Sequence, residues 1–153
     1  MQGVARLPGN RRRTATSRRV GVRVDLAVLA DYATTTADGK LIIVGVFDTI
    51  SVKQFPAVHP SMSLALRVCT GPEDAGEHTL TVRLVDPDGH EIAPTLEAGF
   101  TVDFPPESDD QGALQLVMGL GNVEFKSEGP YAVDILVDGR YEDSVSLRVT
   151  QRS

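Results

Sequence analysis

Apolar and polar residues alternate along most of the chain from Val22 onward, and a period of two is typical of half-buried β-strands. Turn-forming Gly, Pro, Asp and Asn interrupt the alternation roughly every 8–15 residues. The pattern predicts an all-β fold, a two-sheet antiparallel β-sandwich of about seven to nine strands with immunoglobulin-like or C2-like topology. The expected strands are 22–32, 41–52, 62–69, 78–85, 91–93, 98–104, 113–125 (broken at Gly119 or Gly121), 131–137 and 141–149.

The segment 41–52 differs from the others because apolar and β-branched residues fill it almost without alternation. Such a run is typical of a strand that is buried on both faces, so we expect it at the centre of a sheet. The segment FPAVHP at 55–60 follows it. Its prolines cannot donate to a strand ladder, which predicts a crossing between the sheets. Residues 105–111 are expected to form the longest loop.

The last two strands are joined at Asp138-Gly139. A two-residue turn there would set Val133 opposite Ser144 and place core residues against polar ones. A three-residue loop restores the pairing of odd-numbered residues, so we predict a type I turn with a bulge and Gly139 in the left-handed region.

Tyr131 opens the strand that follows Glu128-Gly129-Pro130. This arrangement resembles the tyrosine corner of immunoglobulin-like sandwiches, in which the hydroxyl binds nearby backbone. The alternative is a tyrosine that only packs at the end of the sheet.

Charge is distributed unevenly. Residues 1–23 contain seven arginines and no acidic residue, whereas the remaining 130 residues contain all 21 acidic residues against eight basic ones, a net charge of −13. An acidic body repels phosphate backbones, so we expect no nucleic-acid binding by the folded domain. We therefore divide the chain into a disordered basic arm, 1–21, and a β-sandwich domain, 22–150. No run approaches the ~20 apolar residues of a membrane helix, and the single cysteine forms no internal disulfide, so we expect a cytoplasmic protein.

The segment VDLAVLADYA at 24–33 resembles the opening of an uncharacterised bacterial family of small β-sandwich proteins, a domain of unknown function. DGKL, GVFD, FPAVHP and YAVDI fit the same family, at 38–41, 45–48, 55–60 and 131–135. The resemblance spans about 22–149; it implies a small sandwich and no activity or catalytic residue. Such proteins tend to start just before this opening. Three interpretations of the arm therefore stay open: a misassigned start site, a disordered tail, and an arm that binds nucleic acid or a membrane surface.

The residues needed for catalysis are scattered. Cys69 has no histidine near it in sequence, and His59, His78 and His90 are isolated from one another. Zinc needs three or four converging ligands, and a nucleophile needs an oriented base, and the spacing supports neither. We therefore expect no enzyme and no cofactor. An enzyme whose site is assembled from dispersed carboxylates remains an alternative.

Two acidic loops make a calcium- or small-ligand-binding sandwich the second interpretation. Asp86 and Asp88 lie in the turn DPDG, and Asp109 and Asp110 lie in ESDD at 107–110. Calcium prefers several oxygen ligands, and loops at one end of a sandwich can supply them. The plain alternative is ordinary turn chemistry and a solvated loop.

Phe55, Val58 and Met62 flank the proline-rich crossing and are the candidates for a partner-binding surface. The alternative is that they close the end of the core. The function that fits the sequence best is a non-catalytic protein-interaction module whose partner is a protein. The sequence leaves its oligomeric state open.

Overall fold

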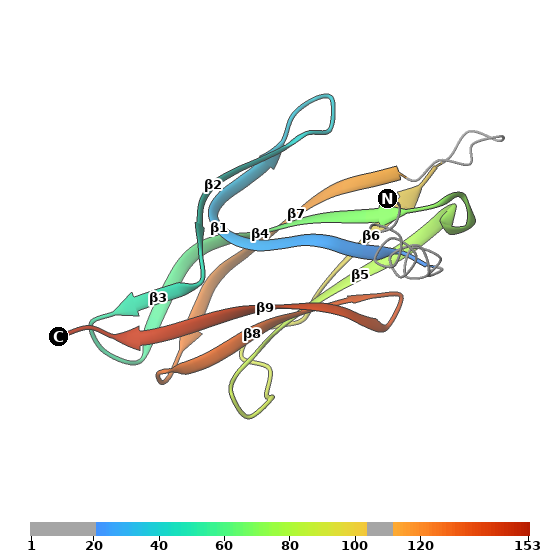
Figure 1. Cartoon of the computed structure of the whole chain (residues 1–153). Helices are drawn as coiled ribbons and strands as arrows, with labels where there is room; N and C mark the ends of the chain where they lie inside the picture. Colours follow the sequence, from blue (N-terminus) through green and yellow to red (C-terminus); the bar gives the residue numbers. More distant parts are fainter. Residues whose placement is uncertain (1–20, 104–111) are drawn as a thin grey trace, which may run out of the picture.

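The computed structural model describes residues 21–103 and 112–153, which form two packed β-sheets (Figure 1). The four-stranded sheet has the order β2-β1-β4-β7 and the five-stranded sheet the order β3-β9-β8-β5-β6. The elements are β1 (Arg23–Thr35), β2 (Leu41–Phe47), β3 (Thr49–Val52), β4 (Ala57–Thr70), the 3-10 helix η1 (Pro72–Asp74), β5 (Gly76–Val85), β6 (Leu96–Val102), β7 (Gly112–Phe125), β8 (Gly129–Val137) and β9 (Arg140–Gln151). The predicted all-β, two-sheet sandwich is confirmed. Neighbouring strands are antiparallel except β3 and β9, which are parallel.

None of the described residues forms a helix that could span a bilayer. Apart from Gly21, the predicted basic arm lies outside the described residues, as does the predicted loop 105–111.

The core lies between the sheets and is built from alternate residues of the strands. Leu64 and Leu66 of β4 belong to the same buried cluster as Leu84 of β5 and Val133 of β8, and each side chain is at most 2% exposed. Burial of one such side chain stabilises the fold by roughly 1.5–3 kcal/mol. Since a shift of one residue would turn every core side chain to the solvent, this alternation fixes the strand registers.

The predicted central strand 41–52 is wrong. The chain changes sheets at Asp48, so that β2 lies at the edge of one sheet and β3 at the edge of the other. The Asp48 carbonyl accepts a hydrogen bond from the Arg148 backbone N–H at 2.8 Å, where β3 begins to pair with β9. An unbroken apolar run is compatible with a central strand and with two edge strands, because it does not specify which faces are covered.

The predicted break in β7 at Gly119 or Gly121 is also wrong, because both glycines pair with β4. The irregularity lies at Asn122, which has a φ of 50° and is skipped by the ladder together with Pro60. Proline cannot donate a backbone hydrogen bond, which explains the gap. The predicted crossing at 55–60 is shorter than expected, since β4 already begins at Ala57.

The prediction for the hairpin between β8 and β9 is confirmed in part. Gly139 has a φ of 82° and odd-numbered residues pair, Val133 with Val145 for example. The predicted three-residue loop is wrong: Asp138 also has a positive φ, 51°, as a two-residue type I′ turn requires. The register shifts instead at Glu142, inside β9. The core dictates the pairing of the inner faces, and a bulge in the strand reconciles it with the preferred turn.

The predicted tyrosine corner is confirmed. The Tyr131 hydroxyl donates to the Ser127 carbonyl at 2.7 Å, and its ring packs edge-on against Phe125 with the centroids 5.0 Å apart. Tyr131 therefore ties the connection between the two sheets to the core.

Candidate functional site

The outer face of the four-stranded sheet is apolar along its β2 edge. The exposed fractions are 58% for Tyr32, 43% for Ile42, 54% for Val44 and 60% for Val46. The register pairs Tyr32 with Val44, so these side chains share one face. We call these four residues, with the free edge of β2, the β2 surface. Within the described chain, β2 has a sheet neighbour on one side only, namely β1.

Gly45 of β2 lies close to the Asp31 side chain of β1. Gly45 has a φ of +74°, and a Cβ atom built on it would lie 2.5 Å from an oxygen of the Asp31 carboxylate. The positive φ favours glycine at this position, and any larger residue would also have to displace the Asp31 carboxylate. The strand itself is held in the sheet by its ladder with β1.

A cleft of about 610 Å³ lies beside β2, β3 and the start of β4. His59 lines it and lies 6.0 Å from the Phe47 ring, centroid to centroid. The Nε2 atom of His59 is buried and has no hydrogen-bond partner among the described residues. The cleft is therefore a mixed surface, on which the imidazole and several apolar side chains lie beside the charged side chains of Asp31, Lys53 and Arg152.

The three residues predicted for partner binding do not form one surface. Val58 is 58% exposed and lines the cleft. Met62 is 2% exposed and belongs to the core, and Phe55 packs against it. The alternative interpretation, that these residues close the end of the core, is correct for Phe55 and Met62.

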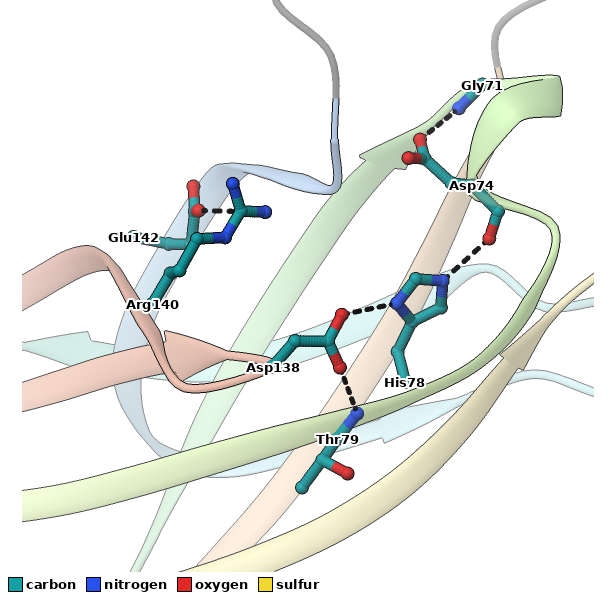
Figure 2. Close-up of polar contacts among 7 residues, drawn as sticks. All are labelled: Gly71, Asp74, His78, Thr79, Asp138, Arg140 and Glu142. Carbon is teal, nitrogen blue, oxygen red and sulfur yellow. Dashed lines mark hydrogen bonds and ion pairs between the residues drawn. The ribbon is translucent and has the colours of Figure 1, made fainter.

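His78 is the centre of a polar cluster that joins three elements (Figure 2). Its Nδ1 lies 2.6 Å from a carboxylate oxygen of Asp138, and its Nε2 lies 2.6 Å from the backbone carbonyl of Asp74. The backbone N–H of Thr79 donates to the other Asp138 oxygen at 2.9 Å. Asp74 in turn accepts a hydrogen bond from the Gly71 N–H at 2.7 Å. The cluster connects η1 and β5 to the turn between β8 and β9.

Both ring nitrogens of His78 face oxygen acceptors, so the ring satisfies both only when it is protonated and donates twice. The hydrogen bond to the Asp74 carbonyl raises the pKa of His78, and the Asp138 carboxylate raises it further against the opposing effect of burial. The hydrogen bond from His78 lowers the pKa of Asp138, and the Thr79 N–H adds to this effect.

This arrangement is a structural clamp that ties the turn between β8 and β9 to β5 and η1. A general base needs a ring nitrogen that can take a proton from a substrate, and here both nitrogens already bind protein oxygens. The clamp could not be predicted from the sequence, because His78 and Asp138 are 60 positions apart. No local spacing could have indicated the contact.

Asp86 and Asp88 come together with His90, with one ligand atom of each within 4.8 Å of the others. However, one Asp86 oxygen already accepts the backbone N–H groups of Asp88 at 2.9 Å and His90 at 2.8 Å. These bonds are those of the turn expected from the sequence. An imidazole beside two carboxylates suits a transition metal better than calcium. The other calcium candidates, Asp109 and Asp110, lie outside the described residues, so the calcium site stays a prediction.

Cys69 is a free, half-buried thiol at the end of β4. Burial raises its pKa, and a hydrogen bond with Asp25 adds to the rise. A raised pKa disfavours the thiolate, which is the reactive form.

A family model described as "Family of unknown function (DUF6941)" matches residues 25–150. No curated protein matches the chain. The fold is similar to part of a Pseudomonas fluorescens alkylpurine DNA glycosylase bound to DNA containing an abasic site analog, with 12% identity over 90% of this chain and 33% of that one, and a TM-score of 0.45.

Two further solved structures are similar. A Listeria innocua beta-glucosidase in complex with glucose has 8% identity over 85% of this chain and 16% of that one, with a TM-score of 0.45. An immunoglobulin-like protein from Pseudomonas aeruginosa has 16% identity over 85% of this chain and 97% of that one, with a TM-score of 0.39. This chain thus spans a third of the glycosylase and less than a fifth of the glucosidase. At these identities and scores the likeness assigns no activity to it.

Proposed function

This chain belongs to the family of unknown function DUF6941, which confirms the resemblance found in its sequence, and we propose that it is a non-catalytic protein-interaction module that binds through the β2 surface. The observation that carries the proposal is the exposure of Tyr32, Ile42, Val44 and Val46 on one face of an edge strand.

These side chains are difficult to explain by folding alone. The inward positions of β2, such as Phe47, already pack against the core. The outward positions add nothing to the core, yet each is aliphatic where a polar residue would suit the solvent. Contiguous apolar surface on a protein is a sign of a binding site. It stands out on a body whose net charge is −13.

The edge of β2 supports the same function. Natural edge strands are protected from pairing by charged residues, prolines or bulges. The seven residues of β2, Leu41–Phe47, include no charged residue and no proline. The strand is irregular at Gly45, which has a φ of +74° and is skipped by the ladder with β1. The free backbone N–H and C=O groups of the residues on either side of Gly45 can accept a further strand, the mode of binding known as strand addition.

We place this module in the cytoplasm. The single thiol, Cys69, is free. A domain of this size does not need a disulfide for stability, so it gains nothing from an oxidising compartment.

Photo-crosslinking tests the proposal. Full-length chain with p-benzoylphenylalanine at position 44 is irradiated in lysate, and the matched control has the probe at position 146, where Ser146 is exposed on β9 of the other sheet. We expect discrete protein adducts at position 44 and few at position 146. Adding Val46→Lys to the probe-bearing chain should lower the yield of the adducts at position 44. Adducts of equal yield at both positions, or none at position 44, would refute the proposal.

A further inference from the structure

We infer that the strand added to β2 is β2 of a second copy of this chain, paired antiparallel about a two-fold axis at Val44. This inference rests on the proposed function and names its partner. The symmetric residue pattern of β2 and its flanks supports it.

Counted outward from Val44, the outward-facing positions of β2 and the residues that flank the strand match in the two directions. Two positions away stand Ile42 and Val46. Four positions away, one residue beyond each end of the strand, stand Lys40 and Asp48. An antiparallel pair centred on Val44 therefore sets Ile42 opposite Val46 of the second copy, and these side chains are in contact because they are opposite on one face of a sheet. It also brings Lys40 to the end of the ladder where Asp48 of the second copy lies, twice in the dimer.

Neighbouring registers lack this match. Moving the axis one residue toward the N-terminus sets Lys40 against Val46. Moving it one residue toward the C-terminus sets Asp48 against Ile42. In both cases a charge opposes an aliphatic side chain, and the ion pairs are lost. A self-complementary patch of this kind is what a closed two-fold dimer requires.

The groups that would pair are accessible. The Lys40 side chain is 78% exposed, and its present partner is Asp38, 3.4 Å away and 66% exposed. Such an exposed ion pair contributes little, so Lys40 can exchange it for another carboxylate. Asp48 is exposed as well. Figure 1 shows the β1–β2 hairpin projecting beyond the rest of the sandwich, with β2 at its outer side.

The charges set the register and do not supply the affinity. Each body carries a net charge of −13, so two copies repel one another at long range. That repulsion is screened beyond about 8 Å at physiological ionic strength. The backbone ladder and the aliphatic pairs hold the dimer, and the Lys40–Asp48 pairs select one alignment.

Cysteine crosslinking tests the register in full-length chain with Cys69 replaced by Ser. Val44→Cys should form an intermolecular disulfide with itself under mild oxidation, because the axis passes through position 44. Val46→Cys alone should not, since it faces position 42, but a mixture of Val46→Cys and Ile42→Cys chains should crosslink. Equal crosslinking of Val44→Cys and Val46→Cys would overturn the register.

A charge exchange tests the ion pairs by sedimentation equilibrium. Lys40→Glu and Asp48→Lys should each weaken the dimer by about tenfold, because each opposes like charges at two places. The double variant restores both pairs, so its dissociation constant should return close to that of the wild type. If the loss of dimer stability in the double variant equals the sum of the losses in the two single variants, the pairing is contradicted.

The oligomeric state separates this inference from the proposed function. A wild-type chain that remains a monomer at the highest concentration it tolerates overturns the dimer. Position-44 adducts with a different protein would then still uphold the interaction module. If neither a dimer nor any adduct forms, both fail.

Discussion

The β1–β2 and β8–β9 hairpins are built from similar residues but end in different environments. In β8 the inward residues Val133, Ile135 and Val137 are fully buried, and neighbouring strands lie on both sides. In β2 the inward residues are only partly buried, while the outward residues Val44 and Val46 are more than half exposed. One buried face is sufficient to hold a strand in a sandwich. The second apolar face of β2 therefore calls for an explanation outside the fold.

The turns of the two hairpins also differ in how firmly they are attached to the rest of the sandwich. The β8–β9 turn is fixed to the body, because Asp138 binds His78 and Thr79 of β5. Within residues 21–103 and 112–153, the β1–β2 turn forms hydrogen bonds only with itself, such as that from the Gly39 N–H to the Thr36 carbonyl at 2.9 Å. One hairpin is thus part of the framework, and the other is held along its strands and free at its tip and edge.

Removing a core side chain from each hairpin should give the largest difference between them. Ile135→Ala should lower the free energy of unfolding by about 3 kcal/mol, because it leaves a cavity in a fully buried site. Ile43→Ala, at a half-buried inward position of β2, should cost about half as much. Urea unfolding at low protein concentration measures both. Equal losses would show that β2 is as much a part of the core as β8.

The contrast also explains what the sequence could predict. Alternation identified β4, β5, β8 and β9, because apolar residues at every second position indicate a strand with one face toward the core and one toward the solvent. The run from Leu41 to Val52 predicted one central strand buried on both faces, and this was wrong, although β2 is apolar on both faces. It could not show that β2 is an edge strand, because the pattern does not record whether the second face is covered by the same chain or by another.

Contacts between distant segments were beyond the sequence for a different reason. The bulge at Glu142 arises from a conflict between a preferred two-residue turn and the register of the core, and only the assembled sheet reveals which position yields. The His78–Asp138 contact depends on β5 and β8 lying side by side. Neither leaves a local pattern in the sequence.

Glycine substitutions extend the comparison to the backbone. Gly45 and Gly139 both have positive φ, at which an L-residue is strained by roughly 1–2 kcal/mol. A Cβ at Gly139 would meet nothing within 4 Å, whereas one at Gly45 would collide with the Asp31 carboxylate. We expect Gly139→Ala to cost about 1 kcal/mol and Gly45→Ala about 2 kcal/mol in urea unfolding. The reverse order would mean that the Asp31 side chain moves aside at no cost.

The His78 clamp should make the β8–β9 side of the molecule sensitive to pH. The folded pKa of His78 is raised above 6.5, so its contribution is complete below that pH and is lost as the pH rises through the raised value. The folded pKa of Asp138 is lowered below 3.8, so its contribution is present above that pH and is lost as the pH falls through the lowered value. The clamp is therefore strongest between these two limits.

We expect the free energy of unfolding to fall by about 1 kcal/mol on the alkaline side of this window, since one charge-assisted hydrogen bond is lost. His78→Gln should remove that fall, and His90→Gln, at an exposed turn position, is the matched substitution. Asp138→Asn should remove the loss of stability at acid pH. It should keep the turn, because asparagine tolerates a positive φ. If the free energy of unfolding of the His78→Gln variant still falls with rising pH as steeply as that of the wild type, His78 is not the group that titrates.

The smallest expected effect is the one that bears most directly on function. Val44→Thr replaces an exposed methyl group by a hydroxyl and keeps the β-branched shape, so it should change the free energy of unfolding of the monomer by less than about 0.5 kcal/mol. The same variant should weaken association through β2, since a hydroxyl group would then face an aliphatic side chain of the partner strand. A loss of stability as large as that of Ile43→Ala would mean that the outward face of β2 serves the fold. An unchanged stability with weakened association means that it serves a partner.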